Sequence, residues 1–350
     1  MKKIIYILFL LFFTGNINAQ IESENLFYMV DKPGSFKSFK NNLDYISIVC
    51  PQTFLVSSEG VISGSVNKRV LELAKAHGIK VMPLIVNKKF NRQILHNLVS
   101  NPNARKRSIE MMLNYAERYE LDGWQFDLEA LHITDRDSFT VYFKETAKAF
   151  HEHGLQLSAA VVHNFENVGG PNEYTRFLYE YWRAGYDLKK MANIGDFLSI
   201  MTYSQHTRRT TPGPVASKLW IKKVVEYLLS EGIPANKISV GIPTYSTHWF
   251  PDYTDEKGGF SNSESLDYDN VEYILDKNDL SPLWDKEAGC HYAIWDNGGI
   301  YEYMYIEDSK SLEEKLDYLK KYKLRGISVW VLGSEDPDFW KIIKEQTIKK

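Results

Sequence analysis

Eight short runs rich in Val, Ile, Phe and Tyr recur along this chain, and their repetition constrains the fold more than any other feature. The runs cover residues 26–30, 43–50, 80–86, 121–129, 155–162, 196–204, 238–246 and 326–332. Between several of them, apolar residues at intervals of three and four predict amphipathic helices over 66–78, 104–119, 135–154 and 216–232. Strands that alternate with helices in this number predict an α/β fold, a closed (β/α)8 TIM barrel, rather than an open sheet.

The interval between the seventh and eighth runs is longer than one loop and one helix require. It contains TDEKGGFSNSESLDYDN and then two strand-like pieces, HYAIWD and YEYMYIE. We expect residues 247–308 to form a small α+β insertion above the carboxyl ends of the strands, and residues 311–322 to form the helix before the last strand. Residues 20–350 are therefore expected to be one barrel domain with an insertion.

The first 19 residues have the layout of a signal peptide. Lys2 and Lys3 precede an apolar core over 4–13, and Asn18 and Ala19 form a small-residue end. The alternative is a membrane anchor, but that would need roughly 20 apolar residues. We therefore expect export to the periplasm or the medium, with no stable membrane insertion after cleavage.

Charge and cysteine usage exclude several classes of function. The chain has 42 basic and 45 acidic side chains, a formal net charge of −3, whereas a nucleic-acid partner calls for a basic surface. The histidines and cysteines show no spacing typical of a zinc site, so no metal is expected. Cys50 and Cys290 do not make a disulfide framework, and we expect two free, buried thiols.

The stretch DGWQFDLE places two carboxylates in a run that otherwise reads as a buried strand. Successive side chains of a strand alternate between faces, so Asp127 and Glu129 share one face while Trp124, Phe126 and Leu128 share the other. Two like charges at close range raise one of the two pKa values, because ionising both is costly. The pattern predicts a general acid.

Aromatic side chains fall at the ends of other predicted strands. Glu129 ends the fourth strand, Tyr203 the sixth and Tyr245 the seventh, and Trp330 lies near the end of the eighth. Catalytic groups of such barrels sit at the carboxyl ends of strands. Sugar rings stack on aromatic side chains and need hydrogen-bond partners for their hydroxyls, so the pattern indicates a carbohydrate cleft.

These residues carry a resemblance to a known family. DGWQFDLE resembles the D-G-x-x-x-D-x-E signature of glycoside hydrolase family 18, MTYS resembles its strand-six motif, and Trp330 in ISVWVLG resembles the tryptophan that ends its eighth strand. GIPANKISVGIPTYSTHW and GISVWVLGSEDPDFW are most similar to the branch that contains bacterial spore-cortex and peptidoglycan glucosaminidases. The similarity runs through most of the chain after residue 19.

The resemblance implies retaining, substrate-assisted hydrolysis of glycans that contain β-linked N-acetylglucosamine. In that scheme Glu129 is the acid, Asp127 holds the acetamide N–H of the substrate, and Tyr203 donates to the acetamide oxygen. Trp330 forms the floor beneath the sugar, and Asp122 anchors the strand. No cofactor is implied, because the nucleophile belongs to the substrate. Peptidoglycan, chitin-type oligosaccharides and N-glycan cores are the expected substrates.

Two departures from the family pattern bear on the site. Gln125 stands where many members have Asp or Asn, and it can hydrogen-bond Asp127 but cannot share a proton with it. Ser204 stands where many members have Asp, which removes a carboxylate from the cleft. These changes keep a second class of function open, a lectin of this family that binds the same glycans without cleaving them. The presence of Glu129 favours the enzyme.

Further residues are expected in or near the cleft. His163 and Asn164 follow the fifth strand, in the right region for substrate contacts. Tyr245 and Trp249 either line the sugar cleft or pack beneath the insertion. Arg208 and Arg209 are expected to be solvated in a loop rather than to meet an acidic group of the substrate.

Overall fold

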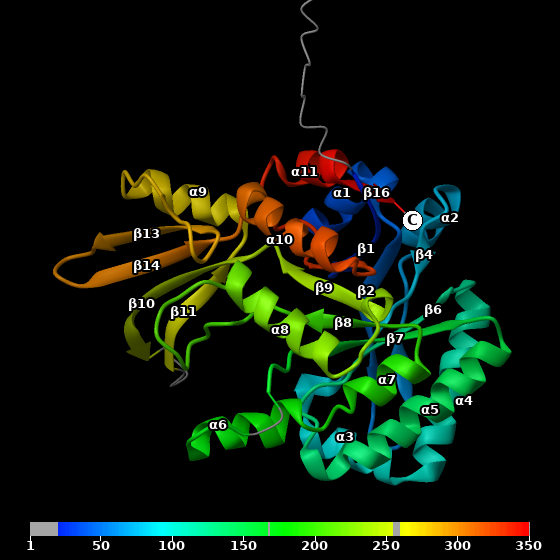
Figure 1. Cartoon of the computed structure of the whole chain (residues 1–350). Helices are drawn as coiled ribbons and strands as arrows, with labels where there is room; N and C mark the ends of the chain where they lie inside the picture. Colours follow the sequence, from blue (N-terminus) through cyan, green and yellow to red (C-terminus); the bar gives the residue numbers. More distant parts are fainter. Residues whose placement is uncertain (1–19, 167–168, 255–259, 350) are drawn as a thin grey trace, which may run out of the picture.

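The computed structural model describes residues 20–166, 169–254 and 260–349 and contains a closed barrel of parallel strands (Figure 1). Strand β1 pairs with both β2 and β15, which closes the ring. The prediction of a TIM barrel is thus confirmed. The barrel strands are β1 (Ile21–Met29), β2 (Ile48–Val56), β5 (Leu84–Asn87), β6 (Gly123–Asp127), β7 (Gln156–Val162), β8 (Phe197–Met201), β9 (Ile238–Pro243) and β15 (Gly326–Trp330).

Helices lie outside the barrel, and several begin at a side chain that caps them. The Asn101 side chain accepts hydrogen bonds from the backbone at the start of α4, and Asp308 and Ser311 form a capping box at the start of α10. The principal helices are α1 (Pro33–Asn41), α2 (Lys68–Ala76), α3 (Arg92–Ser100), α4 (Pro102–Tyr119), α5 (Arg136–Glu152), α6 (Glu173–Leu178), α7 (Leu188–Ile194), α8 (Lys218–Ser230), α10 (Ser309–Tyr322) and α11 (Phe339–Gln346).

The second strand lies further along the chain than the apolar run predicted. Residues Leu43–Tyr45 form a short 3-10 helix, and β2 begins at Ile48 and continues through Val56. The predicted strand ended at Cys50, because Pro51 and Gln52 interrupt the apolar pattern of the sequence. The pairing of β2 with β5 shifts register between Gln52 and Phe54, and this irregularity accommodates a polar residue inside the strand.

The core divides into a layer outside the strands and a smaller cluster inside the barrel. On β6, Trp124 and Phe126 pack outward against the helices, whereas Gln125 and Asp127 point inward. The inner cluster includes Leu26 from β1, together with residues from β2, β5, β7 and β8. The two-residue period of the strands therefore separates side chains that pack against the helices from side chains that face the barrel interior, where apolar residues lie beside buried polar groups.

An antiparallel sheet of five strands lies between β9 and β15 in the sequence, in the order β11-β10-β14-β13-β12 (Figure 1). Helix α9 (Tyr268–Lys277) packs against one face of this sheet. Val271 of the helix is buried there with Leu266 and Met304 of the sheet. The strands are β10 (Ser246–Thr254), β11 (Phe260–Leu266), β12 (Leu283–Asp285), β13 (Cys290–Asp296) and β14 (Tyr301–Ile306). Short strands β3 (Ile62–Gly64), β4 (Lys80–Val81) and β16 (Thr347–Lys349) extend the barrel sheet.

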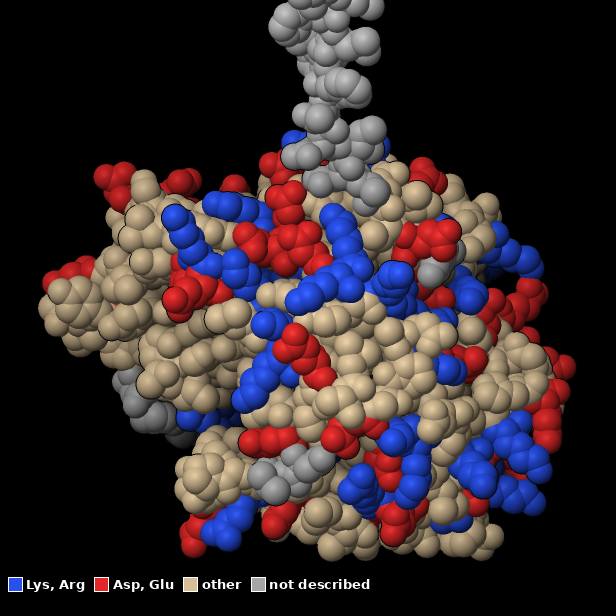
Figure 2. All heavy atoms as spheres, viewed as in Figure 1, with Lys and Arg blue, Asp and Glu red and all other residues tan. Residues whose placement is uncertain are grey.

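The surface is mixed in charge, and both cysteines are buried and free. Figure 2 shows Lys and Arg side chains interspersed with Asp and Glu on one face of the molecule. Over the described ranges, no helix is both long and apolar enough to cross a bilayer. The predicted signal peptide, residues 1–19, lies outside the described residues.

Candidate active site

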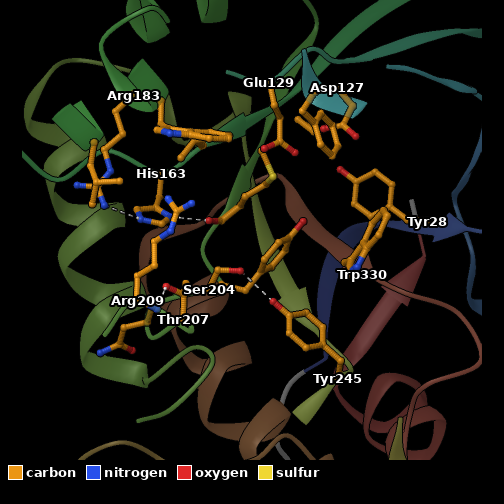
Figure 3. Close-up of a pocket in the computed structure, with 18 of the residues that line it drawn as sticks. Tyr28, Asp127, Glu129, His163, Arg183, Ser204, Thr207, Arg209, Tyr245 and Trp330 are labelled. Carbon is orange, nitrogen blue, oxygen red and sulfur yellow. Dashed lines mark hydrogen bonds between the residues drawn. The ribbon is translucent and has the colours of Figure 1, made fainter. Parts of the chain in front are cut away.

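A cavity of about 640 Å³ opens at the carboxyl ends of the barrel strands. This volume is large enough for a sugar-sized ligand. Each barrel strand contributes a residue on it or within two residues after it: Tyr28, Gln52, Leu84, Asp127, Val162, Met201, Tyr245 and Trp330. Figure 3 shows Tyr28, Asp127, Tyr245 and Trp330 around the cavity. A second cavity of about 760 Å³ shares Ser204, Thr207, Tyr245 and Trp330 with the first. The two cavities therefore adjoin, as a binding site for an extended chain requires.

Asp127, the last residue of β6, lies almost fully buried at the cavity wall, with 5% of its surface exposed. Burial raises the pKa of its carboxyl group, and a hydrogen bond from the Gln52 side chain on β2 opposes that rise. Gln52 is thus the neutral group that stabilises the ionised form of Asp127. Sequence reasoning missed it, although it lies in a short polar interruption of an apolar run.

Glu129 follows two residues later, where the backbone is fixed by one side chain. Asn87, at the end of β5, accepts a hydrogen bond from the Glu129 N–H at 3.0 Å and donates to the Glu129 carbonyl at 3.1 Å. Burial raises the pKa of the Glu129 carboxyl group, and the nearby charge of Asp127 raises it further. A carboxyl group that stays protonated near neutral pH can donate a proton to a bound ligand.

Gln125 does not hydrogen-bond Asp127, although an amide side chain at this position could have done so. Its amide nitrogen donates to the hydroxyls of Ser158 and Ser199, each at 3.0 Å. It lies one layer deeper in the barrel, outside the residues that line the cavity. Its carbonyl oxygen has no hydrogen-bond partner among the described residues. The environment of Asp127 is therefore influenced by Gln52 from β2, which is separated from β6 by β5.

Tyr203, Ser204 and Tyr245 line the cavity together after strands β8 and β9. Burial raises the pKa of the Tyr203 hydroxyl well above its usual value, and the neighbouring acidic groups contribute. Tyr203 is therefore a hydrogen-bond donor at neutral pH. The Ser204 and Tyr245 hydroxyls lie 3.1 Å apart, and the rings of Tyr203 and Tyr245 meet edge to face at 6.2 Å.

Trp330 and Tyr28 form the aromatic side of the cavity, with ring centroids 5.5 Å apart (Figure 3). Tyr28 is fully buried, and burial raises the pKa of its hydroxyl well above the usual value. Trp182 and Tyr174, from the segment between β7 and α7, also line the cavity. Of these four aromatic residues, only Trp330 was predicted, because the others fall outside the motifs.

His163 lines the cavity, but the adjacent Asn164 does not. Neighbouring residues of an extended chain point to opposite sides, and Asn164 lines a separate cavity with Tyr186 and Asp187. Burial, with Arg183 nearby, lowers the pKa of His163 to about 3, so the ring is neutral.

Two more predicted residues lie outside the cavity. Trp249 is buried in β10 with 3% of its surface exposed, so of the two earlier alternatives it packs within the inserted sheet rather than lining the cleft. Asp122 is exposed at the start of β6 and accepts a hydrogen bond from the Val81 backbone N–H at 2.8 Å, which joins β6 to β4.

Comparisons with known proteins find relatives that align with most of this chain. The protein described as "Uncharacterized glycosylase YvbX" from Bacillus subtilis is 26% identical over 91% of this chain and 90% of the relative. The cortical fragment-lytic enzyme of Bacillus subtilis is 24% identical over 86% of this chain and 68% of the relative.

Solved structures share the fold. The spore cortex-lytic enzyme SleL of Bacillus megaterium has a TM-score of 0.82 and 20% identity, over 95% of this chain and 76% of that one. A chitinase from Chromobacterium violaceum has a TM-score of 0.80 and 21% identity, over 92% of this chain and 98% of that one. The family model for glycosyl hydrolases family 18 matches residues 19–336. The chain is therefore a glycoside hydrolase that belongs to glycosyl hydrolases family 18.

Proposed function

We propose that this protein hydrolyses glycans containing β-linked N-acetylglucosamine with retention of configuration, and that the substrate's own acetamido group is the nucleophile. The observation that carries the proposal is the pair formed by Asp127 and Glu129. Both carboxyl groups are desolvated at the wall of a sugar-sized cavity, and the pKa of each is raised by burial. Glu129, the less buried of the two, supplies the proton.

In the first step, Glu129 donates its proton to the glycosidic oxygen while the acetamide carbonyl oxygen attacks the anomeric carbon. The glycosidic bond breaks, the leaving sugar keeps the proton, and a cyclic oxazolinium ion remains in the cavity. Asp127, ionised, accepts a hydrogen bond from the acetamide N–H and stabilises the positive charge that develops there. In the second step, ionised Glu129 takes a proton from water, whose oxygen attacks the same carbon and opens the ring.

Tyr203 donates its hydroxyl to the acetamide oxygen, and its raised pKa keeps that hydrogen in place. Trp330 supports the apolar face of the reacting sugar beside Tyr28. Both contacts strengthen as charge and ring distortion develop, so they favour the transition state over the bound substrate.

Three substrate classes carry the required 2-acetamido group: peptidoglycan strands, chitin-type oligosaccharides and N-glycan cores. Names of relatives support the first two, since they include cortical fragment-lytic enzymes and the chitotriosidase-1 of Mus musculus. We place the activity outside the cytoplasm, in the periplasm or the medium, because residues 1–19 have the charge and apolar pattern of a signal peptide.

The stereochemistry of the first product tests this proposal. Proton NMR during cleavage of a chitooligosaccharide should show the β-anomer first, and a chain whose acetamido groups have been removed should resist cleavage. An α-anomer as the first product, or equal cleavage of the deacetylated chain, would contradict the role given to the acetamido group.

A further inference from the structure

The cavity wall away from Asp127 is lined by two arginines. Arg183 ends the short π-helix η4 (Tyr179–Arg183), and Arg209 lies in the loop after β8. In Figure 3 both side chains lie with His163 on one side, whereas Asp127 and Trp330 lie on the other. One cavity thus combines acidic groups at the end of β6 with two cationic groups, one from η4 and one from the loop after β8.

The groups that hold Arg183 in place do not neutralise it. The His163 Nδ1 lies 2.8 Å from the Met201 carbonyl oxygen, which can only accept, so Nδ1 carries the ring hydrogen. His163 Nε2 is left to accept a hydrogen bond from Arg183 Nη2 at 3.4 Å. The Phe165 ring lies 4.9 Å from the guanidinium carbon. A neutral imidazole and an aromatic ring therefore orient Arg183 and preserve its charge.

Within residues 20–166, 169–254 and 260–349, neither Arg183 nor Arg209 forms an ion pair. The arginines that pair with carboxylates there are Arg105, Arg136 and Arg325. The charge of Glu166 acts on Arg183 from beyond ion-pair distance. Arg183 is half-buried, whereas Arg209 is exposed in its loop, as expected from the sequence. A half-buried cation such as Arg183 that lacks a close anion is incompletely compensated, and a bound anion would offset the cost.

We propose that Arg183 and Arg209 bind a carboxylate carried by the glycan, next to the N-acetylglucosamine whose bond is cleaved. This inference rests on the proposed function, because it assumes that the cavity holds the reacting sugar. A guanidinium matches a carboxylate through two parallel hydrogen bonds. A neutral chitin-type chain offers no such group. A strand in which N-acetylglucosamine alternates with a carboxylate-bearing sugar does, on an ether substituent or on an attached peptide.

The experiment compares matched substrates of equal length. One is a peptidoglycan glycan strand freed of its peptides, which retains the ether carboxylates. The second is the same strand with those carboxylates converted to neutral methylamides, and the third is a strand that keeps its peptides. The values of kcat/KM for the first two report the preference for a carboxylate. The third distinguishes an ether carboxylate from a peptide carboxylate.

We expect the unmutated protein to favour the charged strand roughly tenfold, and Arg183→Gln to abolish most of that preference. Arg183→Lys should keep part of it, because the charge remains while the paired hydrogen bonds are lost. Arg118→Gln, on the exposed side of α4, is the matched control and should keep the full preference. The preference should also weaken as salt concentration rises.

Failure of this inference differs from failure of the proposed function. Equal kcat/KM on charged and neutralised strands would overturn the inference and leave the hydrolase proposal standing. If no strand is cleaved, the proposed function fails, and calorimetric titration of the Glu129→Gln variant still decides the inference. Tighter binding of the charged strand, lost when Arg183→Gln is added, supports it. Equal Kd values for both strands contradict it.

Discussion

At the scale of single residues, the site depends on how little water reaches two carboxyl groups. Asp127 and Glu129 are close enough to influence each other, and burial is the largest cause of the raised pKa of each. Gln52 favours the ionised form of Asp127, so the pair can hold one proton at neutral pH. That division of roles, one ionised group and one protonated group, suits the chemistry proposed above.

The raised pKa of Asp127 predicts that the site reduces stability at neutral pH. Between its unfolded pKa of about 3.9 and its raised folded pKa, the folded state binds more protons than the unfolded state, so stability falls as pH rises. Asp127→Asn removes this loss. We expect the variant to gain about 2 kcal/mol in free energy of unfolding over the unmutated protein at pH 8, and almost nothing at pH 4.

Urea unfolding at the two pH values measures this difference. Asp276→Asn, exposed on α9, serves as the control for replacing a carboxylate by an amide. An Asp127→Asn variant that is less stable than the unmutated protein at pH 8 would show that the folded state favours the charged form.

The sequence predicted which way a side chain points where the alternation of faces along a strand decides its direction. Asp127, Glu129, Tyr203, His163 and Trp330 all reach the cavity, because they lie on or directly after strands at the same end of a parallel barrel. The sequence could not predict how deep in the barrel an inward side chain lies, or how the side chains of the insertion pack. Three predicted contacts, Gln125, Asn164 and Trp249, therefore lie elsewhere.

At the scale of elements, the junction between β5 and the end of β6 positions Glu129. Asn87 holds both backbone groups of Glu129 and also donates to the Asn91 carbonyl. Asn87 is the last residue of β5, and the sequence pattern does not show whether such a residue binds another strand or only begins a loop. Its role depends on β6, which pairs with β5 in the folded barrel.

Replacing Asn87 by Ala should displace Glu129, the proposed acid, and leave backbone groups unpaired. We expect kcat to fall roughly 10- to 100-fold, and the free energy of unfolding to fall by about 2 kcal/mol. Asn101→Ala is the matched control, because it removes the cap of α4 at a cost of about 1 kcal/mol without touching the cavity. If the two variants lose kcat equally, Asn87 acts on stability alone.

At the scale of the whole molecule, a buried ion pair joins the inserted sheet to the barrel helices. Lys315 on α10 pairs with Glu307, which directly follows β14, and both side chains are almost fully buried. Glu307 also accepts hydrogen bonds from the Ser311 hydroxyl and from the Ala216 backbone before α8. The insertion is thereby fixed to helix α10 and to the segment before α8.

Removing one partner of this pair should be costly. Lys315→Met leaves Glu307 buried without its counter-charge, and we expect a loss of about 3–5 kcal/mol in the free energy of unfolding, measured in urea at pH 7. The double variant Lys315→Met with Glu307→Gln should recover part of the loss. No recovery would mean that Lys315 contributes through packing rather than through its charge.

The central claim, that Glu129 is the acid of a glycosidase, is tested most directly by mass spectrometry of products formed in water enriched in heavy oxygen. The unmutated protein and Glu129→Gln are incubated with chitooligosaccharides and peptidoglycan strands. We predict labelled reducing-end N-acetylglucosamine from the unmutated protein only, with binding retained by the variant. Cleavage at a near-normal rate by Glu129→Gln would contradict the assignment, and saturable binding by both proteins without cleavage would indicate a lectin on a hydrolase fold.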